Sequence, residues 1–181
     1  MNGFLPPIRL SHRGQRIVAS LAATGLALAG LLAAPVAAQS FSYAKSAGND
    51  PGQCAAGKGP AARVTVSGLK SSEGNLFVRA YPANSRDWLE SKRYVMRIDA
   101  LPQKGTVSVC VPLPAAGAYA IAVHHDVNGN RKSDLSDGAG MSNNPGIKKI
   151  LGLVPRPPSV DKARFTVGEG VARLSIAVQY M

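Results

Sequence analysis

Seven short segments between residues 63 and 180 carry apolar side chains at every second position. That spacing is typical of a β-strand with one buried face, and turn-forming residues such as Gly, Pro, Asn and Ser separate most of the segments. The predicted strands are residues 63–68, 76–81, 95–101, 106–113, 117–125, 164–167 and 172–180. Because no long segment has the 3.6-residue period of a helix, the pattern predicts an all-β domain.

Strands that each bury one face are stabilised when two sheets pack against each other. The sequence therefore predicts an immunoglobulin-like or transthyretin-like β-sandwich of about seven strands. The strongest strand, 117–125, places Tyr119, Ile121 and Val123 on one face. Its other face carries three alanines, which would allow a second layer to approach closely.

Turn signals organise the rest of this domain. Those at residues 71–75 and 168–170 predict hairpins between the strands on either side. Residues 126–162 form a long connection without a predicted strand. Connections of that length in compact domains are often functional, so we expect the functional site there.

The first 38 residues have the features of a secretory signal peptide. Three arginines precede an uncharged run, 17–34, that is rich in Ala and Leu. Pro35 and small residues up to Ala38 follow, so we predict cleavage after Ala38 and export to the periplasm or the extracellular space. A retained membrane anchor is the alternative, because the run approaches the length that spans a bilayer. The predicted organisation is a signal peptide (1–38), an irregular lead (39–62) and the sandwich domain (63–181).

Cys54 and Cys110 are the two cysteines of the chain. In a small exported domain such a pair usually forms a disulfide, which we predict here. Cys110 would lie on the face of its strand opposite to Val107, Val109 and Val111. The bridge would therefore tie the lead to the outside of the sheet.

The chain is strongly basic. Its formal net charge is +11, and three of the positive charges lie in the predicted signal peptide, which leaves +8. A positive exported protein can meet anionic surfaces such as lipid phosphates or acidic polysaccharide. Because the basic residues are scattered, and not gathered in a stripe with aromatic residues, nucleic acid is not expected as a partner. The expected partner is an envelope component or another protein.

The connection after strand 117–125 begins with a series of oxygen-bearing side chains. Counted from Asp126, they stand at positions one, three, five, nine and twelve, a spacing that resembles a calcium-binding loop. The candidate ligands are Asp126, Asn128, Asn130, Asp134, Asp137 and, through its backbone carbonyl at position seven, Lys132. Calcium is thus the cofactor that the sequence suggests.

Departures from the usual calcium loop leave an alternative open. Arg131 stands at position six, where a glycine usually makes the turn, and position twelve is Asp137 and not the longer Glu. The flanking helices of an EF-hand are also missing from the pattern. The alternative is a loop of Asx-turns, in which Asp and Asn oxygens accept hydrogen bonds from nearby backbone N–H groups.

Three stretches of the chain resemble a known bacterial family. They are residues 113–130 (LPAAGAYAIAVHHDVNGN), 140–144 (GMSNN) and 163–165 (ARF). Over about residues 63–181 the chain resembles the exported family catalogued as domain of unknown function 2141. The resemblance implies an exported β-sandwich and names no activity or substrate. The chain departs from the family pattern by "PAAG" in place of "PPG" and by the basic, Pro-rich stretch 148–158.

Two roles compete on the residues around this connection. The first is a noncatalytic module that binds an envelope component or a partner protein, and it is the favoured one. The second is a metal-dependent enzyme or transition-metal binder that uses His124, His125 and Asp126. Adjacent residues of a strand point to opposite faces, and a catalytic metal needs three ligands with an open position, so we expect no enzymatic activity.

A third role is association with a membrane surface. Residues 146–154 could form a short amphipathic turn whose apolar side meets lipid while nearby basic residues meet phosphate. The alternative is that Ile147, Ile150, Leu151 and Leu153 cap the open end of the sandwich. The candidate surface or partner contacts are Ser142, Asn143, Asn144, Lys148, Lys149 and Arg156.

Overall fold

A computed structural model of the protein describes residues 40–150 and 154–180. All of them belong to one compact unit, Gln39–Met181. The predicted signal peptide and its cleavage site after Ala38 lie outside the described residues. Within the described part of the chain, no helix has the length and apolar character needed to cross a bilayer.

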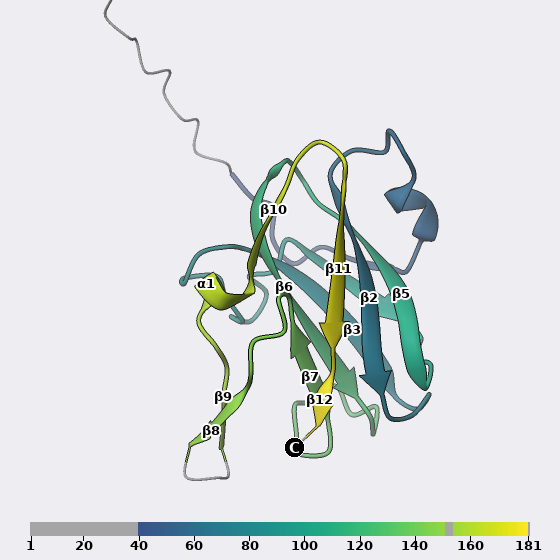
Figure 1. The fold of residues 1–181 in the computed structure, drawn as a ribbon, viewed down its shortest axis with the longest axis vertical. Coiled ribbons are helices and arrows are strands. Elements are labelled where there is room, and N and C mark those ends of the chain that lie inside the picture. Colours follow the sequence, from purple (N-terminus) through teal and green to yellow (C-terminus); the bar gives the residue numbers. More distant parts are fainter. Residues whose placement is uncertain (1–39, 151–153, 181) are drawn as a thin grey trace, which may run out of the picture. The chain divides into compact units, whose positions relative to one another are not determined.

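Two β-sheets form the body of the domain (Figure 1). The larger has seven strands in the order β1-β4-β3-β6-β7-β12, and β10 also pairs with β6. Its strands are β1 (Ser46–Gly48), β3 (Asn75–Pro82), β4 (Met96–Ala100), β6 (Gly117–Asp126), β7 (Gly138–Met141), β10 (Arg164–Val167) and β12 (Gln179–Tyr180). The smaller sheet, in the order β11-β2-β5, consists of β11 (Val171–Ala177), β2 (Ala61–Leu69) and β5 (Gly105–Pro112). The predicted β-rich architecture is confirmed.

Short elements complete the fold. A 3-10 helix, η1 (Pro51–Cys54), precedes β2, and one helical turn, α1 (Val160–Ala163), precedes β10. β8 (Lys148–Ile150) and β9 (Val154–Arg156) form a two-stranded ribbon that pairs with neither sheet. The long connection 126–162 therefore contains β7, the β8–β9 ribbon and most of α1, although the sequence predicted no strand in it.

Side chains from both sheets share one core. β6 contributes Tyr119, Ile121 and Val123, the face that the alternation predicted to be buried, and each is at most 2% exposed. Val109 and Val111 of β5 meet them from the smaller sheet. Each sheet thus buries one apolar face against the other, which is the main source of stability in a two-layer domain.

The outward face of β6 is covered as well. Its small residues Ala120 and Ala122 belong to a second apolar cluster with Trp88 and Ala163. Ala163 lies in α1, and Trp88 lies in the segment 83–94 between β3 and β4. The prediction that the alanine face of this strand admits a second layer is confirmed.

Both predicted hairpins are wrong. β2 pairs with β5 and β11 in the smaller sheet, whereas β3 pairs with β4 and β6 in the larger, so residues 71–75 carry the chain between sheets. Residues 168–170 likewise lead from β10, which pairs with β6, to β11, which runs parallel to β2. A turn signal indicates that the chain reverses but does not say which strands pair, and here the neighbours in sequence lie in different sheets.

The segment 39–62 was expected to be an irregular lead, and its described residues, 40–62, take part in the domain. β1 runs parallel to β4 at the edge of the larger sheet. The predicted Cys54–Cys110 disulfide is present and joins η1 to β5. Both cysteines are buried with Ala61 in a small cluster separate from the main core. The bridge therefore lies on the outer face of the smaller sheet, as the alternation in β5 predicted.

Candidate functional site

The end of β6 directs two adjacent histidines to opposite faces of the larger sheet. His125 is fully buried, and both of its ring nitrogens are engaged. Its Nδ1 accepts from the Tyr180 hydroxyl at 2.6 Å, and its Nε2 donates to the Glu73 carbonyl at 2.9 Å, because a carbonyl can only accept. His124 instead faces Asp137 on the outward side. This geometry does not favour a metal shared by the two histidines.

Asp126 ends β6 and opens the acidic loop, which we define as residues 126–137. Its side chain is fully buried, and Oδ2 accepts from Asn75 Nδ2 and from Arg131 N, each at 2.9 Å. Burial alone would raise the pKa of Asp126, but these hydrogen bonds outweigh it and hold the pKa below the ordinary 3.8. The other oxygen, Oδ1, is buried and has no hydrogen-bond partner among the described residues. A buried oxygen of a charged group without a partner is costly, so this atom is where a ligand could bind.

The backbone makes the turn at position six of the loop despite its side chain. Arg131 has φ 62°, in the left-handed region that a glycine occupies without strain. The Asp126 carboxylate accepts the Arg131 N–H and so stabilises this conformation. The absence of a glycine at position six therefore does not prevent the sharp turn.

The middle of the loop gathers three more of the candidate ligands. Asn128 Nδ2 and Asn130 Nδ2 both donate to Asp134 Oδ2, at 2.7 and 3.2 Å. Asn128 Oδ1 accepts from Asn130 N, and Asn130 Oδ1 accepts from Lys132 N, which are Asx-turns. Hydrogen bonds from Ser136 Oγ and from the two Asn side chains lower the pKa of Asp134 from 3.8 to about 2.

Asp137, the last candidate ligand, closes the base of the loop. Its Oδ2 lies 2.9 Å from His124 Nε2 and accepts from Asp134 N at 3.1 Å, while Oδ1 accepts from Val127 N at 3.2 Å. Asp137 is buried, with 6% of its surface exposed. Its carboxylate therefore faces His124 and the loop backbone.

The acidic loop thus brings Asn128, Asn130 and Asp134 together and leaves one oxygen of Asp126 free. Within the described residues, no three side chains of His, Cys, Asp or Glu lie together so as to hold a metal ion. The acidic loop gathers Asn128, Asn130 and Asp134, of which only Asp134 belongs to these four residue types. Hard cations such as Ca²⁺ accept amide and carbonyl oxygens as well as carboxylates.

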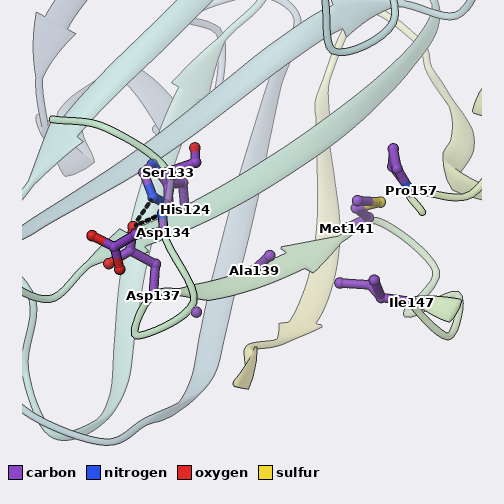
Figure 2. A pocket seen from close by; sticks show the side chains of 9 residues that line it. His124, Ser133, Asp134, Asp137, Ala139, Met141, Ile147 and Pro157 are labelled. Carbon is purple, nitrogen blue, oxygen red and sulfur yellow. Dashed lines mark hydrogen bonds and ion pairs between the residues drawn. The ribbon is translucent and has the colours of Figure 1, made fainter. Parts of the chain in front are cut away.

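A pocket of about 170 Å³ adjoins this loop on the outward face of the larger sheet. Figure 2 shows His124, Ser133, Asp134 and Asp137 at one side and Met141, Ile147 and Pro157 at the other, with Ala139 between them. The polar side comes from the end of β6 and the acidic loop, and the apolar side comes from β7 and the flanks of the β8–β9 ribbon. Such an arrangement suits a ligand with both a polar and an apolar part.

Comparison with known proteins shows the family to which this domain belongs. The family model described as "uncharacterized protein conserved in bacteria (DUF2141)" matches residues 64–175. The chain belongs to the DUF2141 family. The match covers the sandwich from β2 to β11 and includes the acidic loop. Searches of curated proteins and of solved structures found no match.

In this DUF2141 domain the Ser142-Asn143-Asn144 stretch is a clamp between segments. Ser142 is fully buried; its Oγ accepts from Ile121 N at 2.9 Å and donates to the Ala163 carbonyl. Asn143 Nδ2 donates to the Arg164 carbonyl at 2.8 Å. The prediction of Ser142 as a surface contact is wrong, because its hydroxyl satisfies two buried backbone groups.

Asn144 extends the clamp to the smaller sheet. Its Nδ2 donates to the Ser175 carbonyl at 2.9 Å, and its Oδ1 accepts from Ala177 N at 2.7 Å, so it pairs with β11 as a strand would. Asn143 and Asn144 are exposed, but both have positive φ, 65° and 51°, which Asn tolerates better than most residues. Backbone geometry and polar contacts therefore explain this motif without a partner.

Replacing the buried hydroxyl of the clamp should destabilise the domain. Ser142→Ala leaves Ile121 N and the Ala163 carbonyl without a partner, so we expect the free energy of unfolding to fall by about 1–3 kcal/mol. Chemical denaturation measures the change. Ser159→Ala is the matched control, because Ser159 is exposed and its side chain makes no capping bond. A loss no larger than that of the control would contradict the role of Ser142.

The remaining candidate contacts lie at the β8–β9 ribbon. Lys148 and Arg156 are exposed and stand directly opposite each other in the antiparallel register. Lys149 pairs with Pro155 in the same ribbon, but its side chain lies outside the described part. Ile147 packs on the outer apolar cluster with Trp88 and not on the end of the main core. The side chains of Ile150, Leu151 and Leu153 are likewise not described.

Proposed function

We propose that the protein is an exported, noncatalytic binding module of the bacterial cell envelope whose acidic loop binds a calcium ion. The observation that carries the proposal is the buried Oδ1 of Asp126, which has no hydrogen-bond partner among the described residues. It lies at the start of a loop that already gathers Asn128, Asn130 and Asp134. Ca²⁺ takes six to eight oxygen ligands, and this oxygen is free to be one of them.

The remaining ligands would come from the same turn. Asn128 and Asn130 direct Nδ2 toward Asp134, and rotation of each amide would direct an oxygen to that place instead. The Lys132 carbonyl would follow at position seven, and Asp137 would act from the base of the loop. Because hydrogen bonds hold the pKa values of Asp126 and Asp134 low, both are ionised at neutral pH, and calcium need displace no proton from either.

Export is supported by the Cys54–Cys110 disulfide, since disulfides are typical of oxidising compartments outside the cytoplasm. We therefore place the mature protein, cut after Ala38, in the periplasm or the extracellular space. For the sandwich itself we propose the immunoglobulin-like or transthyretin-like type, in which some connections, such as those before β3 and before β11 here, carry the chain from one sheet to the other.

Calcium should raise the melting temperature of the purified exported protein, and a chelator should reverse the rise. At a hundredfold excess over the Kd, binding to the folded state adds about 2.7 kcal/mol to the free energy of unfolding. Scanning calorimetry with and without calcium measures this. Asp134→Ala should abolish the response because it removes a charged ligand. Asp126→Asn should do the same, because one oxygen remains for Asn75 and Arg131 while the free oxygen becomes an amide nitrogen.

Asp50→Ala is the matched control for these variants. Like the Asp134 carboxylate, that of Asp50 is exposed, accepts hydrogen bonds, here from Gly52 N and Gln53 Nε2, and has a lowered pKa, but it lies outside the acidic loop. This variant should keep the full calcium response. If calcium leaves the melting temperature of the wild-type protein unchanged, and the protein as isolated contains no metal, the acidic loop is a set of Asx-turns and the calcium proposal fails.

A further inference from the structure

A second pocket lies on the same outward face as the pocket beside the acidic loop. It measures about 360 Å³ and is predominantly polar. Its lining includes three basic residues, one acidic residue and two tyrosines, which are Arg79, Lys92, Arg97, Glu90, Tyr81 and Tyr94. Ser133, near the tip of the acidic loop, lines this pocket and the apolar one as well. The two pockets are therefore neighbours, and we call them together the outer groove.

Strand register gives the distance between the two ends of the outer groove. Arg97 of β4 stands opposite Arg79 of β3, Arg79 opposite Ala122 of β6, and Ala122 opposite Met141 of β7. These four residues form one row across four adjacent strands. Since neighbouring strands lie about 4.8 Å apart, the row is roughly 14 Å long. Arg79 and Arg97 line the polar pocket and Met141 lines the apolar one. Ala122 between them is buried in the outer apolar cluster, so the row gives the distance between the two ends and not an open path.

The basic end of the row carries more positive charge than the nearby carboxylates of Asp99 and Glu90 neutralise. Arg97 is paired with Asp99, with Nε at 2.6 Å from Oδ1. Arg79 is half-buried, and its guanidinium lies over the Phe77 ring at 5.1 Å but makes no hydrogen bond or ion pair with the described residues. A guanidinium has five N–H donors, so Arg79 can bind a carboxylate or phosphate in two-point fashion.

The wall of the outer groove next to Arg79 is held rigidly. It is the segment 83–94, whose Asp87 is 2% exposed and accepts from Tyr43, Asn84 and Arg93. Trp88 of the same segment donates from Nε1 to the Pro158 carbonyl at 2.9 Å. Because the wall is fixed at Asp87 and at Trp88, the groove is open before a ligand binds, and this lowers the entropic cost of binding.

We infer that the outer groove binds one molecule of an anionic amphiphile. A carboxylate or phosphate head would lie on Arg79, with Lys92 beside it. An acyl chain would pass Ser133, which lines both pockets, and enter the apolar pocket around Ala139 and Met141. That pocket, about 170 Å³, compares with an apolar cavity of about 150 Å³ that takes up benzene. The inference rests on the proposed role as an envelope binding module and names its ligand, but it does not depend on calcium.

Decanoate is the probe, used in isothermal titration below the concentration at which it forms micelles. We expect one site per chain, with binding by decyl phosphate as well. Acetate, which has the head alone, and decanol, which has the chain alone, should bind at least tenfold more weakly. Absence of decanoate binding, or equal binding of decanol, would overturn the inference.

Variants test the two ends of the outer groove separately. Arg79→Gln keeps a polar side chain but removes the charge, and should weaken decanoate binding about tenfold. Ala139→Phe fills the apolar pocket and should abolish binding. Arg173→Gln is the matched control, because Arg173 is an exposed strand arginine on β11 of the smaller sheet. Equal affinity of all three variants would mean that decanoate binds elsewhere.

Two further measurements distinguish this inference from binding to a membrane surface and from the calcium proposal. Vesicles containing phosphatidylglycerol should not sediment the protein; if they do while free decanoate does not bind, a membrane surface is the partner and the inference fails. The decanoate titration is repeated with a chelator. Binding that persists there while calcium gives no melting response would refute the calcium loop and leave the outer groove standing.

Discussion

Replacing Cys54 and Cys110 with serine should lower the free energy of unfolding by about 4 kcal/mol. The disulfide spans a sequence separation of 56 residues. In the chain-entropy account, a closed loop of this length restricts the unfolded chain enough to give that value. The bridge also holds η1 against β5, so its loss should release the segment that precedes β2.

Thermal melting with and without a reducing agent checks this. Reduction should lower the melting temperature of the wild-type protein by roughly 10–15 °C, given the usual relation between free energy and melting temperature for domains of this size. The Cys54→Ser/Cys110→Ser variant should melt near the reduced wild type and should not respond to the reducing agent. A wild-type protein that melts at the same temperature in both conditions would contradict the prediction.

The strands were predictable because one physical constraint decides them. A half-buried strand alternates its faces, and this alone located β5 and β6 and assigned Tyr119, Ile121 and Val123 to the core. The same alternation placed Cys110 on the outside of its strand and His124 and His125 on opposite faces. These features depend only on neighbours along the chain, which the sequence displays directly.

Pairing between strands was not predictable in the same way. The segment 172–180 was predicted as one strand, yet β11 pairs with β2 in the smaller sheet and β12 with β7 in the larger. The chain changes sheets at Val178, whose N–H donates to the Ser67 carbonyl at 2.9 Å. The short strand β7 was missed because Gly138 and Gly140 give it no alternating pattern. Those glycines allow β11 and β12 to approach it, a contact between distant segments.

The position of the acidic loop was predictable from the sequence, whereas its surroundings were not. The spacing of Asp and Asn located the acidic loop, because its members are close in sequence. The outer groove was not foreseen, since Arg79, Ser133 and Met141 come from β3, the acidic loop and β7, which only the fold brings together. One signal was available in the sequence: Arg79 interrupts an otherwise apolar strand, and a charged residue on a half-buried strand invites the question of what it faces.

Gly74→Ala should be the most damaging of the single substitutions considered, with a loss of about 2–5 kcal/mol. Gly74 has φ +75°, and a Cβ there would lie 1.9 Å from the Asp126 carbonyl oxygen and 2.7 Å from that of Val127. The left-handed backbone costs about 1–2 kcal/mol with a side chain present, and forcing the two segments apart costs about 1–3 kcal/mol more. Denaturant unfolding measures the sum.

Gly57→Ala separates these two contributions. Gly57 has nearly the same φ, +78°, but a Cβ there would meet nothing within 4 Å, so this variant should show the backbone cost alone. The difference between the two variants is then the cost of displacing the end of β6, where Asp126 begins the acidic loop. If calcium binds there, Gly74→Ala should also weaken the calcium response while Gly57→Ala leaves it intact. Equal losses in the two variants would show that the chain at Asp126 moves aside freely, and would remove the structural reason for a rigid, preformed loop.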